Sequence, residues 1–166
     1  QYLDSLEMTA TIKGFEPLYI QRIAQLTNKS NQFNLTTLRC SEDDIRAMAG
    51  DKNDLCLCGK LVDKFGDNGI VTVVAGRQQG DVLDLTLWLM SCRVLKRGME
   101  DAMMDTVVAE AAARGVKTIV GHYYPTAKNA MVREFYAQYD FAKTAEDADG
   151  NTEWTLDVAA YKVGGQ

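Results

Sequence analysis

The sequence contains few of the residues that hold metals or cross-link secreted proteins. Its 166 residues include one histidine, His122, and four cysteines, and the cysteines do not form pairs with metal-ligand spacing. We therefore expect no metal site. Cys56 and Cys58 lie two residues apart in a strand-like stretch, so we expect them on one face, as packed thiols in a reducing compartment.

The sequence also lacks a long apolar run and a charged start followed by an apolar segment, so it predicts neither a membrane span nor a secretion signal. Acidic residues outnumber basic ones, which gives a formal net charge of −5. A nucleic-acid binder normally carries a basic face, so we expect no nucleic-acid partner. A soluble cytoplasmic protein without a membrane partner fits these features best.

Length and apolar content limit the number of domains. The 166 residues, 46% of them apolar, are enough for one hydrophobic core and too few to suggest two. We therefore expect a single domain over residues 1–166. The chain begins with Gln1 and reaches a strand-like pattern within a few residues, so we expect it to be part of a longer protein.

Hydrophobic periodicity predicts a mixed α/β fold. Apolar residues spaced by three and four predict helices over residues 17–27, 42–49, 97–114 and, after Pro125, from 126 to about 139. Strand-like patterns occupy residues 9–13, 55–62, 70–76, 82–90, 118–124, 141–146 and 152–158, with a turn at 64–69 and a polar loop at 28–37. This order predicts a mixed, mostly antiparallel sheet with helices on both faces.

The passage from strand to helix at residues 87–100 is the first candidate site. A strand that ends in a polar loop and feeds a helix near Gly98 presents free backbone N–H groups and the positive end of the helix dipole, which favour an anion. Lys96 and Arg97 add positive charge there. Many helices begin after a Gly or an Arg without binding a ligand, so the pattern leaves both interpretations open.

Asn129 and Tyr136 form the second candidate site. They lie seven residues apart on the expected helix, and therefore on one face about two turns apart. A Tyr hydroxyl near a departing thiolate can act as a general acid, and an Asn amide can hold a peptide-like arm through paired hydrogen bonds. The alternative is that Tyr136 is a core aromatic residue whose hydroxyl reaches water.

Two of these segments, RGMEDAMM and NAMVREFYAQYDF, resemble the phosphate-binding loop and the later Asn-to-Tyr helix of the GNAT acyltransferase superfamily. The longer strings QLTNKSNQFNLTT, DKFGDNG, LMSCRVLKRGME and YYPTAKN are similar to the C-terminal region of FkbH-type proteins, and the resemblance covers nearly the whole chain. It implies the GNAT fold, in which the fourth and fifth strands splay apart around a pantetheine arm. It also implies an upstream domain of the haloacid-dehalogenase (HAD) type.

The resemblance further implies a role in loading a glycolytic three-carbon acyl group onto the pantetheine of an acyl carrier protein. The expected ligand is that arm, or coenzyme A. Tyr136 matches the general acid, and Asn129 matches a contact to the arm. The other matched contacts are Leu89, Met90 and Ser91, whose backbone pairs with the arm, and Lys96, Arg97, Gly98 and Met99 of the phosphate-binding loop.

Two residues depart from the superfamily pattern. Glu100 stands where a small residue is usual, and Asp140 stands where a Gly usually precedes the Phe. A carboxylate beside a pyrophosphate costs energy because like charges repel. Free coenzyme A carries more phosphate charge than a carrier-protein arm, which has one phosphodiester, so we expect carrier-linked pantetheine to be preferred.

Further candidates lie in the polar loop and at strand ends. Asn31, Asn34 and Arg93 are candidate substrate contacts on the acceptor side of the cleft; alternatively, the amides tie the loop to itself. His122 can be a base or a substrate contact, or an ordinary hydrogen-bonded histidine. Cys92 can be a nucleophile because positive neighbours favour the thiolate, although the sequence shows no paired base.

The sequence therefore leaves two functions open. In the first, the domain is an acyltransferase in which Tyr136 protonates the thiolate and the strand at 89–91 polarises the thioester carbonyl. In the second, it is a non-catalytic module that binds the pantetheine arm and presents it to the upstream domain. The pairing of Asn129 with Tyr136 favours the first function. Glu100, Asp140 and the lack of an evident base favour the second.

Overall fold

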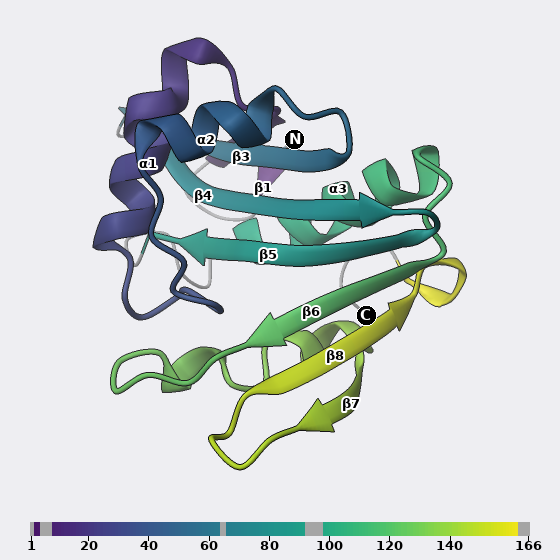
Figure 1. Cartoon of the computed structure of the whole chain (residues 1–166). Helices are drawn as coiled ribbons and strands as arrows, with labels where there is room; N and C mark the ends of the chain where they lie inside the picture. Colours follow the sequence, from purple (N-terminus) through teal and green to yellow (C-terminus); the bar gives the residue numbers. More distant parts are fainter. Residues whose placement is uncertain (1, 4–7, 64–65, 92–97, 163–166) are drawn as a thin grey trace.

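The computed structural model describes residues 2–3, 8–63, 66–91 and 98–162. Within these ranges the strands form one sheet in the order β1-β2-β3-β4-β5-β6-β8-β7 (Figure 1). Neighbouring strands are antiparallel except β5 and β6, which are parallel. The strands are β1 (Tyr2–Leu3), β2 (Met8–Lys13), β3 (Asp54–Asp63), β4 (Gly66–Gln79), β5 (Val82–Met90), β6 (Thr118–Tyr123), β7 (Ala142–Glu146) and β8 (Thr152–Asp157).

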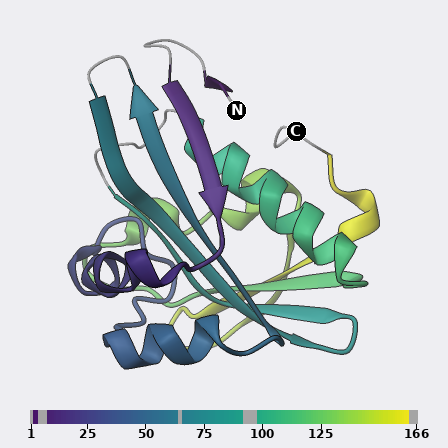
Figure 2. The same ribbon diagram turned by 90° about the horizontal axis from the view of Figure 1, so that it is seen from above.

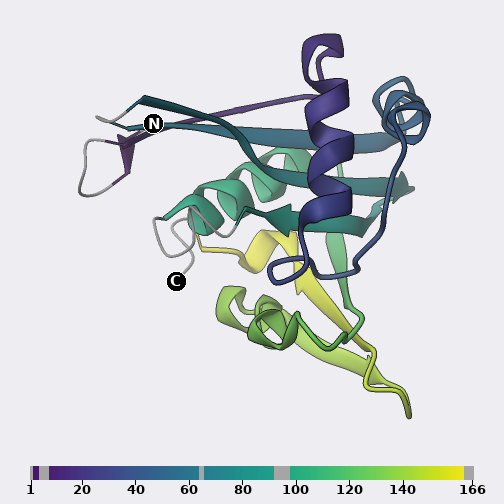
Figure 3. The same cartoon turned by 90° about the vertical axis from the view of Figure 1, so that its left-hand side faces the viewer.

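Helices cover both faces of this sheet, which confirms the expected fold class. On one face lie α1 (Ile20–Lys29), preceded by the 3-10 turn η1 (Pro17–Tyr19), and α2 (Glu42–Ala49). On the other face lies α3 (Met99–Ala113), as Figure 2 shows. Figure 3 shows α1 in front of the sheet and the chain after it turning back toward α2. Among the described residues, no helix is long and apolar enough to cross a membrane.

A β-bulge in β5 decides which side chains face each helical layer. Ala75 of β4 pairs with Leu87 and Gly76 pairs with Leu85, so Thr86 is the extra residue. After the bulge, Trp88 and Met90 point to the α3 side and join its hydrophobic cluster. Leu87 and Leu89 pack instead with α1 and α2.

Local signals in the sequence set the ends of the helices. Ser41 and Asp44 form a capping box at the start of α2, each side chain accepting the other's backbone N–H. Gly98 precedes α3 with a φ of 85°, and Gly115 follows it with a φ of 79°. Glycine adopts this left-handed conformation without the steric cost that other residues have, so Gly115 ends the helix as expected.

The helix expected from residue 126 to about 139 is wrong. The structure has two short 3-10 helices there, η3 (Ala130–Val132) and η4 (Tyr136–Tyr139). The backbone N–H groups bond to the third residue back and not to the fourth, as those of Val132 to Asn129 O and of Phe135 to Val132 O show. Asn129 and Tyr136 therefore do not share one face of a continuous helix.

The strands β3 and β4 extend further than expected. A turn was expected over residues 64–69, but β4 begins at Gly66, and Val62 pairs with Asp67. The Gly, Asp and Asn residues of this stretch favour a turn locally, but Gly66 and Asp67 pair with β3, and the register shifts between Asp67 and Ile70. Residues 64–65 lie outside the described part.

Cys56 and Cys58 lie in the cluster that α1 and α2 cover, and both are free thiols. Burial raises the pKa of Cys56 to about 12 and that of Cys58 to about 11. The thiols therefore stay protonated at neutral pH, which confirms that they are packed residues. Within the described ranges, no group of three or more His, Cys, Asp or Glu side chains can hold a metal ion.

Candidate functional site

The parallel strands β5 and β6 diverge soon after they begin. They pair only between Val82–Asp84 and 118–120, and beyond that point the two strands separate (Figure 1). The splay expected between these strands is confirmed. Any site built around it lies toward Met90 of β5 and Tyr123 of β6.

The chain's own segment 33–35 crosses this splay. The N–H of Leu35 donates to Trp88 O at 3.0 Å, and the N–H of Met90 donates to Phe33 O at 3.0 Å. The N–H of Tyr124 then donates to Leu35 O at 2.9 Å. The segment therefore links β5 to the chain just after β6, and it uses the backbone groups of β5 that face away from β4.

This pairing changes the role expected for residues 89–91. Leu89 and Met90 are fully buried, and Thr72 Oγ1 donates to Leu89 O at 2.7 Å. The N–H of Ser91 donates to Val71 O at 2.7 Å. The segment 33–35 therefore already occupies Trp88 O and the N–H of Met90, two of the backbone groups of β5 that face the splay.

Asn129 is fully buried and holds the same segment in place. Its Nδ2 group donates to Asn34 O at 2.9 Å and to Tyr124 O at 3.0 Å. Its Oδ1 accepts the N–H of Thr126 at 2.8 Å and the hydroxyl of Tyr123 at 3.3 Å. The amide that was expected to hold an arm thus fastens three parts of the chain to one another.

A cavity of about 370 Å³ lies between the start of α3 and the segment of η3 and η4. We call it the α3 cavity. Its described lining consists of Phe33, Gly98, Glu100, Asp101, Met131, Val132, Phe135, Gln138 and Tyr139. The structure thus places Gly98 at a cavity. Lys96 and Arg97 lie outside the described residues, as do Cys92 and Arg93.

The described lining of the α3 cavity is negatively charged, because it includes Glu100 and Asp101 and no described Lys or Arg. Both residues belong to the first turn of α3, where carboxylates offset the positive end of the helix dipole. Asp101 also accepts a hydrogen bond from the Tyr139 hydroxyl at 2.7 Å. Met99 points the other way, into the core below Gly59.

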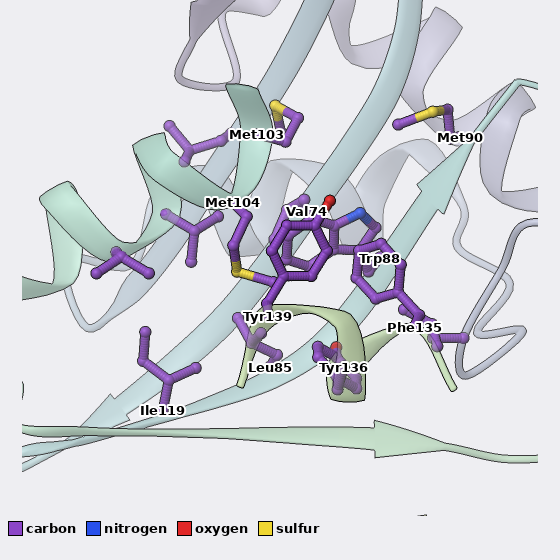
Figure 4. Close-up of a cluster of buried hydrophobic side chains, with 14 of the residues drawn as sticks. Val74, Leu85, Trp88, Met90, Met103, Met104, Ile119, Phe135, Tyr136 and Tyr139 are labelled. Carbon is purple, nitrogen blue, oxygen red and sulfur yellow. The ribbon is translucent and has the colours of Figure 1, made fainter. Parts of the chain in front are cut away.

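Tyr136 lies in the hydrophobic core and not in the described lining of the α3 cavity (Figure 4). Its ring packs against Trp88, Phe135 and Phe141. A Cβ atom on Gly121 would come within 2.5 Å of this ring, so β6 approaches it as closely as a glycine allows. Burial raises the pKa of Tyr136, which disfavours the loss of its proton. The interpretation as a core aromatic residue therefore fits the geometry better than that of a general acid.

His122 pairs with Asp84, a residue that the sequence analysis missed. His122 Nε2 lies 2.5 Å from Asp84 Oδ1, and the ring of Tyr124 lies 5.9 Å from that of His122. The His122 side chain is 18% exposed and that of Asp84 is 47% exposed, so the pair is open to solvent. Asp84 and His122 are 38 residues apart, and only the pairing of β5 with β6 brings them together.

A second cavity, of about 590 Å³, lies beside the end of α1. We call it the α1 cavity. Its described lining consists of Arg22, Leu26, Lys29, Ser30, Asn31, Gln32, Met90, Ser91 and Lys128. Asn31 and Ser91 are thus placed at a cavity. Asn34 is not, because it is fully buried and binds Ser30 O and the N–H of Thr37.

Comparison with known proteins gives matches in structure alone. No protein-family model and no curated protein matches the sequence. A putative acetyltransferase of the GNAT family from Desulfovibrio desulfuricans superposes with a TM-score of 0.70 at 13% identity, over 90% of this chain and 99% of the other. The ribosomal-protein-S18-alanine N-acetyltransferase of Escherichia coli gives 0.68 at 15% identity, over 90% and 94%.

A third solved structure is the spermidine N-acetyltransferase from Vibrio cholerae in complex with CoA and spermine. It superposes with a TM-score of 0.66 at 9% identity, over 90% of this chain and 96% of the other. Identities this low carry the fold and not the activity. The chain therefore has the fold of the GNAT acetyltransferases.

Proposed function

We propose that this chain binds the pantetheine arm of an acyl carrier protein and presents the attached acyl group. The observation that carries the proposal is the position of the α3 cavity. It lies at the N-terminus of α3 and beside the splay, with Phe33 and Phe135 in its wall. The Vibrio spermidine acetyltransferase of the same fold is a complex with CoA, which supports a pantetheine ligand for this fold.

The carboxylates in the described lining of the α3 cavity favour a carrier-linked arm over free coenzyme A. Glu100 and Asp101 line it, and each would repel a phosphate group nearby. A carrier-protein arm brings one phosphodiester, whereas coenzyme A brings a pyrophosphate and a further phosphate. The repulsion is therefore smaller for the carrier-linked arm.

The positions of Tyr136 and Asn129 favour a domain that presents the arm over one in which these two residues catalyse acyl transfer. Tyr136 is buried in the core. The side-chain amide of Asn129 is hydrogen-bonded to the backbone of Asn34, Tyr124 and Thr126. The resemblance to FkbH-type proteins supports an upstream HAD-like domain as the source of a three-carbon acyl group. In this proposal that domain supplies the acyl group, and the present chain holds the arm that carries it.

Acyl transfer within this chain is the second candidate, and the contact between His122 and Asp84 favours it. A carboxylate that accepts a hydrogen bond from one ring nitrogen of a histidine fixes the orientation of the ring. It also leaves the other ring nitrogen without a proton, so that this nitrogen can act as a base. The pair lies on β5 and β6 next to the point where they diverge. If it acts as a base, Asp84→Asn lowers the transfer rate by about 10²-fold without changing the affinity for the arm.

Calorimetry with holo carrier protein, apo carrier protein and free coenzyme A tests the main proposal. We expect binding to the holo form, weaker binding to coenzyme A, and no binding to the apo form. Saturation with acylated holo carrier then shows whether transfer occurs. Equal binding of the holo and apo forms would rule out recognition of the arm, and rapid transfer would favour the second candidate.

A further inference from the structure

The α1 cavity gathers cations in a chain whose formal net charge is negative. Arg22 and Lys29 come from α1, and Lys128 comes from the segment before η3, 99 residues after Lys29 along the chain. None of the three forms an ion pair with a described residue, whereas Lys13, Arg46, Arg77 and Lys143 all do. The fold therefore brings three positive charges, without an ion-pair partner among the described residues, to one cavity.

The rest of the described lining adds hydrogen-bonding groups and no carboxylate. Ser30, Asn31, Gln32 and Ser91 are polar, and Leu26 and Met90 are apolar. This is the reverse of the α3 cavity, whose described lining carries Glu100 and Asp101. The described linings of the two cavities thus have opposite charge, although one stretch of chain lines both: Ser30, Asn31 and Gln32 line the α1 cavity, and the next residue, Phe33, lines the α3 cavity.

The C-terminus of α1 would oppose an anion here, because the last carbonyl groups of a helix carry the negative end of its dipole. Arg39 offsets this effect. Its Nη1 group donates to Thr27 O and, at 2.8 Å, to Ser30 O. Its Nη2 group donates to Asn31 Oδ1 at 2.7 Å, so the Asn31 amide is held with its oxygen toward Arg39 and its Nδ2 group is left to donate elsewhere.

From these observations we infer that the α1 cavity binds a small molecule through an anionic group, a carboxylate or a phosphate. Arg22, Lys29 and Lys128 supply the charge, and Asn31 Nδ2 supplies a hydrogen bond to an anionic oxygen. Leu26, on the α1 side of the cavity, contacts a short carbon chain between charged groups. That this molecule is the acyl substrate rests on the proposed function, whereas binding of the anion does not.

NMR titration of the ¹⁵N-labelled chain tests the inference, with inorganic phosphate, malonate and uncharged glycerol as probes. We expect phosphate and malonate to give saturable shifts centred on residues 30–32 and Ser91, and glycerol to give none. The double variant Arg22→Gln/Lys128→Gln should weaken binding roughly tenfold, since each solvent-accessible cation contributes a factor of a few. The matched control Lys52→Gln/Lys117→Gln removes two exposed cations that line neither cavity, and it should bind as the wild type does.

Several results would overturn the inference. One is an absence of saturable shifts with both anions, and another is equal weakening in the two double variants. A third is that Arg22→Gln/Lys128→Gln weakens only the binding of an acidic carrier protein, because the cations would then form a protein-docking surface. Anion binding without any binding of holo carrier would leave the α1 cavity assigned and reject the proposed function, so the two failures are distinguishable. Unchanged thermal unfolding of both double variants shows that each one is folded.

Discussion

Asn129 donates a hydrogen bond to the backbone carbonyl of Asn34, 95 residues earlier in the chain, at 2.9 Å. The same amide group also donates to Tyr124 O, the residue that follows β6. Since the segment 33–35 pairs with β5, the Asn129 side chain completes a link between two strands that do not pair at this level. The conformation of the splay thus depends on one buried amide.

Replacement of Asn129 by Ala should therefore destabilise the fold. The change leaves the buried carbonyl group of Asn34 and the N–H of Thr126 without this partner, and we expect a loss of about 2–3 kcal/mol in the free energy of unfolding. Urea denaturation measures it. The control Asn31→Ala removes a half-buried amide with a hydrogen bond from Arg39, and should cost less than about 1 kcal/mol. If Asn129 only contacts a ligand, the two variants will be equally stable.

The sequence predicted the helical layers, the antiparallel order and, through the family resemblance, the splay. It failed at residues 126–139 because periodicity reports the spacing of apolar side chains, which does not separate an α-helix from successive 3-10 turns. The N–H groups of Val132 and Phe135 bond to the third residue back, which gives 3-10 turns in place of an α-helix. The spacing of Asn129 and Tyr136 therefore suggested a shared face that the chain does not form.

Long-range pairing explains what else the sequence could not show. The contact of Asp84 with His122 and the crossing of the splay by residues 33–35 depend on partners about 40 to 90 residues apart, and no local pattern encodes them. The α1 cavity is a similar case, since Lys128 joins Arg22 and Lys29 only in the folded chain. One signal was available: Asp84 is the polar residue between two leucines of a strand, which places it on the opposite face from them.

Glu100→Gln should increase the affinity for free coenzyme A. The change removes one carboxylate from the α3 cavity, and at a partly exposed site this relieves about 1 kcal/mol of repulsion, or roughly fivefold in affinity. The gain should shrink at high salt because screening weakens the repulsion that is removed. Calorimetry at two salt concentrations measures both effects. Glu110→Gln, on an exposed part of α3, is the matched control, and an equal gain there would argue against a local effect.

Cys58→Ala should change how stability depends on pH. Burial raises the pKa of Cys58 to about 11 in the folded state, above its value in the unfolded chain, so the unfolded state loses this proton first. The free energy of unfolding therefore falls as pH rises from the unfolded pKa toward 11, by on the order of 1 kcal/mol between pH 8 and pH 10. The variant should lose this part of the slope. Denaturation at both pH values tests it, and parallel changes in the two proteins would contradict the assignment.

Tyr136→Phe separates presentation of the arm from transfer by this residue. The ring packs in the core against Trp88 and Phe135, and a Phe ring keeps those contacts. We therefore expect the melting temperature to stay within a few degrees of the wild type. The affinity for holo carrier and the rate of carrier loading should stay within a few-fold of it. A fall of about 10²-fold in loading, with folding and affinity intact, would instead identify the Tyr136 hydroxyl as a general acid.

The matched variant is Tyr139→Phe, which removes a hydroxyl from a residue that lines the α3 cavity. Tyr139 donates to Asp101 at 2.7 Å, and losing this bond leaves the carboxylate less stabilised and more exposed to a bound phosphodiester. We expect weaker binding of holo carrier by about three- to tenfold, with the loss reduced at high salt. If Tyr139→Phe is silent while Tyr136→Phe impairs binding, the arm does not occupy the α3 cavity, and the ligand must approach the core side of β6 instead.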